Sequence, residues 1–357
     1  MMEKEGGLMQ KLMDYGKYLN LNFGNDVINI ITKIYENKGK SELFSISHPD
    51  VLNKLIKMAK VQSVEASNKI EGIFTTDKRL KEIVLSKATP LNRDESEIAG
   101  YRSALELIHT SYAHMDVSPN IILQLHKILY QFSGQSFGGK YKNSDNIIEE
   151  RDRFGNRTVR FIPVKSYLVE EYVNQLCTEY NYIINQNIID PLFIIPIFIF
   201  DFLCIHPFND GNGRMSRLLT LLLLYKSGYY VGKYISIEKI IENTKDTYYD
   251  TLQLSNIGWH EQDNDCSSFI KYYLGVVVHA YRLLEERYII VREEKVSNEE
   301  RVYKYISESI TPISKKELVD VLTDISQITI ERQLSSLLKK NMIEKVGVGR
   351  STRYSVV

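Results

Sequence analysis

The sequence of 357 residues predicts a mainly α-helical protein with one β-hairpin and a small α+β domain at its C-terminal end. Three observations support this fold class. Apolar residues recur at helical spacing along most of the chain. The alternation typical of strands is confined to residues 146–162 and 343–356. Two apolar segments that predict buried helices, 198–205 and 218–224, enclose a short polar string.

Residues 1–92 are expected to form an N-terminal helical domain. Val61, Val64 and Ile70 follow a helical spacing, and Gly72 stands where a helix-terminating glycine is expected. Glu71 directly precedes this glycine, so we expect its carboxylate at the end of a helix.

Residues 93–292 are expected to form the core of the protein, a helical bundle with one β-hairpin. Residues 146–149 and 158–162 alternate as strands do, and residues 152–156 supply a turn. The helices are expected near residues 94–112, 119–132, 164–186, 192–205, 213–227 and 266–290.

Residues 301–357 are expected to form a separate small domain after a charged stretch, 293–300, that reads as a linker or a solvated helix end. Ser314 and Glu317 form a capping box that opens one helix. A second helix is expected around residues 330–338, and a glycine-containing hairpin follows it. Two helices and a two-stranded wing resemble a winged-helix domain.

The charge of this C-terminal segment leaves two kinds of partner open. Its ten basic and six acidic residues give a net charge of +4. Basic side chains here could contact DNA phosphates, as in helix-turn-helix proteins. A protein-contact or dimerisation module of the same fold is the equal alternative. The basic residues concerned are Arg332, Lys339, Lys340, Lys345, Arg350 and Arg353.

Composition limits the class of protein. The 45 basic and 45 acidic residues cancel, which argues against a chain that coats nucleic acid or binds acidic membranes. Three isolated cysteines provide neither a metal spacing nor a disulfide framework. The first residues lack a signal pattern, and the apolar stretch 192–204 is too short to span a bilayer. We therefore expect a cytoplasmic protein without membrane contact; a homodimer is left open.

The polar string at 206–217 reads His-Pro-Phe-Asn-Asp-Gly-Asn-Gly-Arg-Met-Ser-Arg. Gly211 and Gly213 allow the backbone to approach a ligand closely. They stand at the start of a helix, where free N–H groups attract anions. Arg214 and Arg217 are three residues apart, so we expect both to contact phosphate oxygens.

Two further residues of this string suit nucleotide chemistry. Asp210 offers a hard oxygen ligand for Mg²⁺, which prefers one or two carboxylates together with substrate phosphates. His206 could accept a proton from an attacking hydroxyl. The plain alternative is a helix–helix turn in which both side chains only hydrogen-bond the backbone. The combination of residue types favours the nucleotide site.

The string resembles the signature of the Fic family, His-x-Phe-x-Asp/Glu-Gly-Asn-Gly-Arg-x-x-Arg, at every specified position. Most members of that family transfer AMP from ATP to a Ser, Thr or Tyr hydroxyl of a protein. The resemblance implies that His206 is the general base and Asp210 the Mg²⁺ ligand. It also implies that the 211–214 backbone and Asn212 form the anion hole, with Arg217 beside the γ-phosphate.

A second segment, Ser67-Asn68-Lys69-Ile70-Glu71-Gly72, fits the family's inhibitory pattern, Ser/Thr-x-x-x-Glu-Gly/Asn. Its position before the catalytic loop resembles the subclass with the inhibitory helix at the N-terminal side. The resemblance implies that Glu71 forms a bidentate pair with Arg217 and so removes the partner of the γ-phosphate. A solvated surface glutamate is the plain alternative.

Two more segments are similar to parts of the family's substrate sites. Tyr248, Tyr249 and Asn256 lie in a stretch similar to the adenosine pocket, where rings stack on the purine and an amide binds its edge. Core packing is the alternative for the tyrosines.

The hairpin resembles the flap that holds the target protein by strand addition. Ile147, Ile148 and Glu149 stand where the family has a Trp-Ile-Gly-like strand, and Lys142 where it often has Arg. These departures leave the target protein open.

The expected function is therefore that of a protein adenylyltransferase, autoinhibited by Glu71, that uses ATP and Mg²⁺. Its acceptor would be a hydroxyl of a target protein or of the chain itself. One alternative is a DNA-binding regulator whose core senses a nucleotide. Another is a transferase with a different nucleotide donor.

Overall fold

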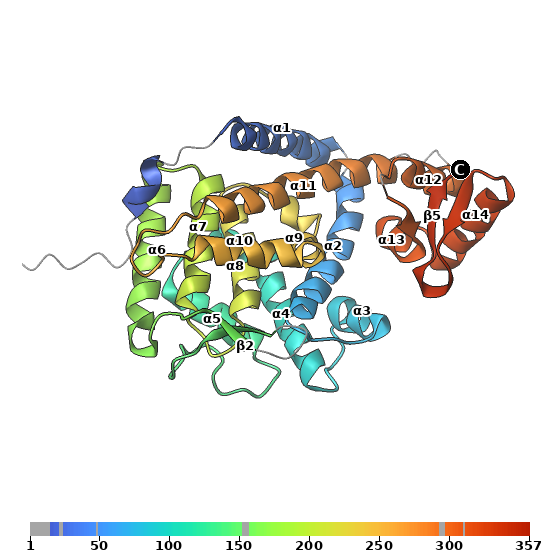
Figure 1. The fold of residues 1–357 in the computed structure, drawn as a ribbon. Coiled ribbons are helices and arrows are strands. Elements are labelled where there is room, and N and C mark those ends of the chain that lie inside the picture. The colour runs from blue at the N-terminus through green and yellow to red at the C-terminus, as the bar shows by residue number, and fades with distance from the viewer. Residues whose placement is uncertain (1–14, 21–23, 48, 152–156, 293–296, 310) are drawn as a thin grey trace, which may run out of the picture. The chain divides into compact units, whose positions relative to one another are not determined.

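The computed structural model describes residues 15–20, 24–47, 49–151, 157–292, 297–309 and 311–357, and helices dominate them (Figure 1). Contacts divide the chain into two compact units. The larger comprises Met1–Lys33, Lys60–Tyr230 and Ser236–Val278, and the smaller Ile34–Ala59, Val231–Ile235 and His279–Val357. The division of the sequence into 1–92, 93–292 and 301–357 stays a prediction.

Two buried helices form the centre of the larger unit. They are α7 (Pro191–Ile205) and α8 (Asn212–Lys226), whose residues are buried on nearly every side. Helices that pack on this pair or on its neighbours are α4 (Arg93–Ser111), α5 (Pro119–Leu129) and α6 (Val169–Asn185). All five were predicted, and most bounds differ by one to three residues. Helix α6 begins later than expected because a short 3₁₀ helix, η3 (Ser166–Leu168), precedes it.

Further helices surround this centre. Helices α1 (Asn25–Ser47), α2 (Pro49–Ile70) and α11 (Ser267–Arg292) contribute residues to both units. The remaining helices of the larger unit are short: η1 (Tyr15–Asn20), α3 (Asp77–Ser86), η2 (Tyr112–His114), α9 (Ile237–Asn243) and α10 (Lys245–Ser255). Within the described residues, no helix has the length and apolar character needed to cross a membrane.

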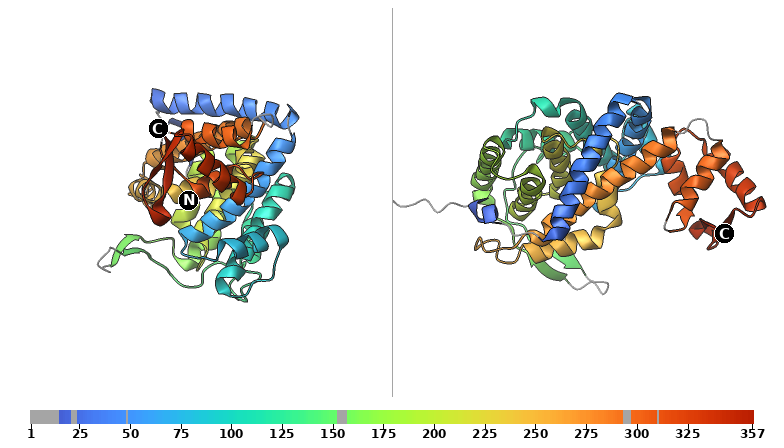
Figure 2. Two further views of the ribbon diagram at one scale, coloured as in Figure 1. Left: turned by 90° about the vertical axis from the view of Figure 1, so that its right-hand side faces the viewer. Right: turned by 90° about the horizontal axis from the view of Figure 1, so that it is seen from above.

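The predicted hairpin is present. Strands β1 (Ile148–Arg151) and β2 (Arg157–Phe161) pair antiparallel and extend beyond the helices of their unit (Figure 2). The strand bounds differ from the predicted ones by one or two residues. The expected turn at 152–156 lies outside the described residues.

The C-terminal part of the smaller unit contains the predicted elements together with a further helix, a further strand and the short 3₁₀ helix η5 (Gly349–Ser351). The predicted helices are α13 (Lys315–Val321), which opens with the Ser314 capping box, and α14 (Gln327–Lys339). The hairpin consists of β4 (Ile343–Val346) and β5 (Arg353–Val356). Helix α12 (Asn298–Ser307) begins within the charged stretch 293–300, and strand β3 (Ile313–Ser314) completes a sheet of order β3-β5-β4. The name winged helix stays a prediction.

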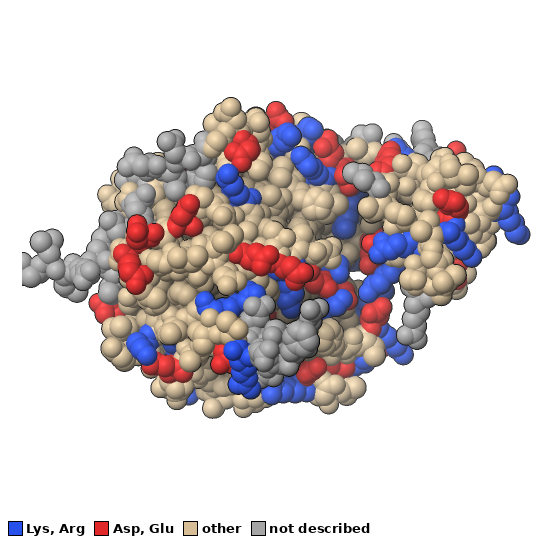
Figure 3. All heavy atoms as spheres, viewed as in Figure 1, with Lys and Arg blue, Asp and Glu red and all other residues tan. Residues whose placement is uncertain are grey.

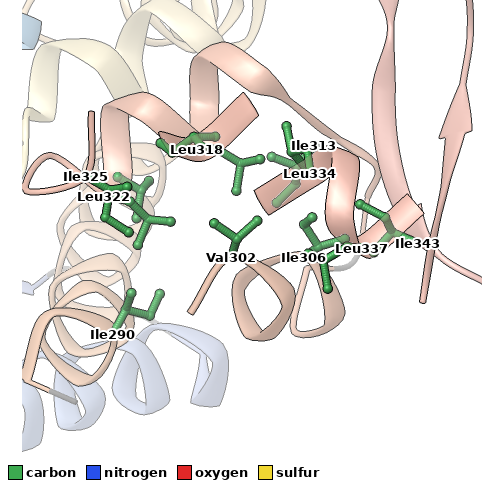
Figure 4. Close-up of a cluster of buried hydrophobic side chains, with 12 residues drawn as sticks. Ile290, Val302, Ile306, Ile313, Leu318, Leu322, Ile325, Leu334, Leu337 and Ile343 are labelled. Carbon is green, nitrogen blue, oxygen red and sulfur yellow. The ribbon is translucent and has the colours of Figure 1, made fainter. Parts of the chain in front are cut away.

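A hydrophobic cluster stabilises this second unit (Figure 4). Helices α12, α13 and α14 and the two strands at the edges of the sheet contribute to it, so the sheet and the helices share one core. Its buried members are Ile290, Val302, Ile306, Ile313, Leu318, Val321, Leu322, Ile325, Ile330, Leu334, Leu337 and Ile343.

Candidate active site

His206 caps the C-terminal end of helix α7 and lines a cavity. Its backbone is left-handed, with φ of 50°, and its N–H donates to the carbonyl of Phe202 at 3.0 Å. Its Nδ1 lies 3.3 Å from the carbonyl oxygen of Leu203. Because a carbonyl only accepts, Nδ1 carries the proton and Nε2 keeps its lone pair. Burial, followed by the positive charge of Lys142, lowers the pKa of His206 to about 4, so the imidazole is neutral at pH 7.

His126 on α5 fixes the loop that follows His206. Its Nδ1 accepts from the N–H of Gly139 at 3.0 Å, so its Nε2 carries the proton and donates to the carbonyl of Asp210 at 3.1 Å. The ring stacks on Phe208 with centroids 3.7 Å apart. Burial lowers the pKa of His126 to about 4. His126 was not predicted as a site residue, because a single histidine in an amphipathic helix does not reveal its partner.

Asn212 shapes the loop with its side chain. Its Oδ1 accepts from the N–H of Phe208 at 3.0 Å, and its Nδ2 donates to the carbonyl of Phe208 at 2.8 Å. The amide group is therefore used within the loop. Gly211 has a φ of 85°, and a side chain there would meet Tyr130 Oη at 2.9 Å. This close approach requires glycine.

The two arginines of the loop have different neighbours. Arg214 is buried, with Nη1 2.7 Å from Glu97 Oε2, and its Nη2 donates to Tyr130 Oη at 2.7 Å. Arg214 and Arg217 were expected to contact the same ligand. In the structure their side chains have different partners instead. Helical spacing places the two residues on the same face of α8, but the buried carboxylate of Glu97 determines the direction of the Arg214 side chain.

Arg217 lies against the end of α2. Its Nε donates to Ser67 Oγ at 2.8 Å, and its Nη2 donates to the Ser67 carbonyl at 2.9 Å and to Glu71 Oε1 at 2.7 Å. Burial alone would lower the pKa of Arg217, but the charge and hydrogen bond of Glu71, together with the charges of Tyr101 and Tyr248, raise the pKa above its usual value. The contact with Glu71 uses one carboxylate oxygen, whereas a bidentate pair was expected.

Gly72 and Gly213 allow this contact. Gly72 has a φ of 78° and ends the turn after α2, as expected of a helix-terminating glycine. At Gly213 a side chain would collide with the carboxylate of Glu71.

A cavity of about 210 Å³ contains these groups. His206, Gly213, Arg217 and Glu71 line one part of it, and the predicted Tyr248, Tyr249, Asn256 and Ile148 line it as well. Leu252 and Gln253, from the same stretch as Tyr248 and Asn256, line it too. The lining residues that were not predicted are Arg160, Phe161, Phe200, Leu203 and Cys204.

Several predicted site residues do not line this cavity in the described part of the chain. They belong to the loop and the start of α8, to the end of α2 and the turn after it, or to the hairpin. They are Ser67, Gly72, Ile147, Glu149, Asp210, Gly211, Asn212 and Arg214.

Asp210 is the residue for which a metal role was expected. Its Oδ1 accepts from the N–H of Gly211 at 2.6 Å, and its Oδ2 lies 3.7 Å from Arg214 Nη2. The side chain is 50% exposed, so the carboxylate can bind an incoming ion. Clusters of three or more His, Cys, Asp or Glu suited to a metal are absent from the described residues. A single carboxylate fits Mg²⁺ that also binds nucleotide phosphates.

The base of the hairpin is attached to the wall of the cavity. Phe161 stacks on His260 with centroids 5.3 Å apart, and His260 Nε2 lies 2.8 Å from the carbonyl of Ile162. At the start of the hairpin, the buried Lys142 donates through Nζ to Asn146 Oδ1 at 2.8 Å. Ile147 is 54% exposed. The flap therefore combines an anchored base with an exposed apolar residue.

Comparison with protein families and with curated proteins gives a consistent result. The family model of the Fic/DOC family matches residues 116–224. A Fido domain-containing protein of Dictyostelium discoideum is 30% identical over 124 residues, which are 35% of this chain and 80% of that protein. Protein adenylyltransferase fic-1 of Caenorhabditis elegans is 26% identical over 183 residues, which are 50% of this chain and 32% of that protein. The chain thus spans about a third of the length of this adenylyltransferase.

Solved structures show the same fold. A Fic family protein from Desulfovibrio desulfuricans G20 superposes with a TM-score of 0.62 at 19% identity, over 94% of this chain and 97% of that one. Fic-1 from C. elegans superposes with a TM-score of 0.56 at 21% identity, over 74% of this chain and 71% of that one.

Proposed function

Since this chain belongs to the Fic/DOC family, we propose that it is a protein adenylyltransferase that transfers AMP from ATP to a hydroxyl of a protein. The observation that carries this proposal is the shared cavity of His206, Gly213 and Arg217, with Glu71 paired to the arginine. The names of the curated relatives support the same activity.

The proposed reaction uses the neutral imidazole of His206. Its Nε2 accepts the proton of a Ser, Thr or Tyr hydroxyl, whose oxygen attacks the α-phosphorus of ATP. A new P–O bond to the acceptor forms, the bond to the bridging oxygen breaks, and pyrophosphate leaves. The backbone N–H groups at the start of α8 and the guanidinium of Arg217 would bind the phosphates.

The proposal includes Mg²⁺, with Asp210 as the ligand from the protein. Bound there, the ion would neutralise phosphate charge and orient the leaving group. The half-exposed carboxylate of Asp210 supports this role.

Autoinhibition by Glu71 is part of the proposal. Arg217 cannot bind both the carboxylate and a γ-phosphate fully, because its Nη2 atom already donates to Glu71 at 2.7 Å.

We expect the protein to act in the cytoplasm, and its three buried, free cysteines support this location.

The experiment that tests the function compares labelled donors. ATP labelled at the α-phosphate should transfer its label to protein, whereas ATP labelled at the γ-phosphate should not. UTP and GTP with α-label test other donors in the same assay. Label from the γ-position would contradict AMP transfer.

The surface of α14 favours DNA contact as a second candidate function. Ile328, Arg332, Ser335 and Lys339 are all exposed and lie on one helix face. The neighbouring Lys340 pairs with Glu299, but within the described residues no ion pair involves Arg332 or Lys339. In Figure 3, Lys and Arg spheres lie at the right-hand edge of the view, where Figure 1 has α14. Such a face suits the phosphates and thymine methyl groups of a major groove.

Neighbouring lysines provide a matched test of this contact. Binding to a duplex of about 20 base pairs should weaken with salt, with a slope of about −0.9 per phosphate contacted. Lys339→Ala should reduce the slope by about one contact, while Lys340→Ala should leave it unchanged. Equal effects of the two changes, or binding without salt dependence, would contradict a DNA-binding face on α14.

A further inference from the structure

The turn that carries Glu71 is fixed on one side by its own helix. The N–H groups of Glu71 and Ile73 both donate to the carbonyl of Asn68 at 3.0 Å, and that of Gly72 to the carbonyl of Lys69 at 3.1 Å. The carbonyl of the last helical residue, Ile70, has no such partner within α2, because the helix ends there.

Lys245 supplies the partner for this carbonyl. Its Nζ donates to the oxygen of Ile70 at 2.9 Å, immediately before Glu71. A cation at the C-terminal end of a helix also interacts favourably with the helix dipole. The contact therefore stabilises the end of α2 in the position from which Glu71 reaches Arg217.

The same ammonium group contacts the wall of the cavity. Lys245 is the first residue of α10, and its Nζ lies 5.8 Å from the ring centroid of Tyr249, which lines the cavity. A single half-buried side chain thus connects the turn before Glu71 with the proposed adenosine wall.

Two further contacts between α2 and α9 in the described residues lie further from Glu71 or are weaker. Ser63 Oγ donates to the buried carboxylate of Glu238 at 2.7 Å, two helical turns earlier. Lys69 pairs with Glu242 at 2.9 Å, but the Lys69 side chain is 43% exposed, and exposed ion pairs contribute little.

We propose that Lys245 is a positioning residue for autoinhibition, which fixes the inhibitory turn so that the Glu71 carboxylate meets Arg217. This inference rests on the proposed function, because it assigns a further part of the same inhibitory device. Removing the ammonium frees the Ile70 carbonyl, loosens the turn and shifts Arg217 toward the nucleotide.

The first test measures self-labelling from α-labelled ATP. Lys245→Met keeps the apolar stem beside Tyr249 and should raise the rate severalfold, but not above that of Glu71→Gly, because Lys245 acts only through Glu71. Lys245→Arg retains a cationic donor and should restore the wild-type rate. Lys239→Met is the matched control, since Lys239 pairs with Glu242 on α9 and has no contact with the turn in the described structure; it should leave the rate unchanged.

The second test separates positioning from direct nucleotide contact. If Lys245 acts through Glu71, Lys245→Met should add nothing in a Glu71→Gly background. A lower rate of the double variant than of Glu71→Gly would overturn the proposal, because Lys245 would then contact the nucleotide itself. An unchanged rate of Lys245→Met in the wild-type background would overturn it as well.

Hydrogen exchange of the turn tests the positioning role of Lys245 independently of the reaction that the protein catalyses. The amides of residues 71–73 should exchange faster in Lys245→Met than in wild type or Lys239→Met, without nucleotide and whatever reaction the protein catalyses. Absence of labelling in Glu71→Gly would contradict the proposed function, whereas unchanged exchange at 71–73 would contradict the positioning role.

Discussion

Gly213 and Glu71 lie so close together that a methyl group on Gly213 would collide with the carboxylate of Glu71. Gly213 lies in α8 and Glu71 in the turn that follows α2, and the ion pair between Glu71 and Arg217, four residues after Gly213, brings them together. Under the proposed function, the glycine at the first turn of α8 has a second role besides approach to phosphate, which is to leave room for the carboxylate of Glu71.

This contact predicts that the effect of Gly213→Ala on the free energy of unfolding changes sign when Glu71 is replaced. Gly213→Ala should destabilise the wild-type protein, because the new methyl group displaces Glu71 from Arg217. In a Glu71→Gly background the collision with the carboxylate is absent, although Arg217 Nη1 still lies 3.3 Å from the new methyl group. The same change should then stabilise the fold by less than the ~0.5–1 kcal/mol that separates Ala from Gly in the middle of a helix. Denaturant unfolding of the four proteins measures both values. Equal effects in the two backgrounds would disprove the contact.

His206→Ala should reduce AMP transfer by about 10²- to 10⁴-fold and leave ATP binding largely intact, because the phosphate contacts come from other residues. In the Glu71→Gly background, the pH profile of transfer should retain its rate from pH 7 down to about 5, since burial lowers the pKa of His206 to about 4. A loss of activity centred near pH 6.5 would contradict the buried, neutral base.

Asp210→Ala should weaken ATP binding in the presence of Mg²⁺ and remove the Mg²⁺ dependence of the binding that remains. The loop offers no second carboxylate, because Asn209 is neutral. Calorimetric titration with and without Mg²⁺ measures the dependence. The same enhancement by Mg²⁺ in the variant and in wild type would exclude Asp210 as the ligand.

His126 predicts a pH dependence of stability. Its pKa is about 4 in the folded protein and near 6.5 in an unfolded chain, so between these values the unfolded state binds more protons. Stability is therefore lost as the pH falls from about 6.5 toward 4. The loss is about 1.4 kcal/mol for each unit by which the pKa values of the folded and unfolded states differ. His126→Gln should reduce this slope of unfolding free energy against pH. An identical slope would show that His126 is not the titrating group.

Strong local patterns made the central helices predictable. The apolar runs of α7 and α8 and the glycines of the loop determine where these helices end, and Gly72 ends the turn after α2 because left-handed backbone favours glycine. These features depend on residues near in sequence, which is why spacing was sufficient to predict them.

The partners of buried polar groups could not be predicted in this way. Arg214 pairs with Glu97, 117 residues earlier, and His126 contacts the carbonyl of Asp210, 84 residues later. Helical spacing gives the face on which Arg214 starts, but a buried charge turns toward its counter-charge, wherever the fold places it. Arg160 on the hairpin also lines the cavity. This could not be predicted from spacing either, because the position of the hairpin depends on the tertiary fold.

The competition for Arg217 is the central claim, and self-labelling by α-labelled ATP tests it most directly. Wild type should label weakly, and Glu71→Gly should label severalfold more strongly, because a charge-assisted hydrogen bond to Arg217 is removed and the guanidinium becomes available to the γ-phosphate. The double variant Glu71→Gly, Arg217→Ala should lose this gain. Equal labelling by wild type and Glu71→Gly across a range of ATP concentrations would contradict the claim.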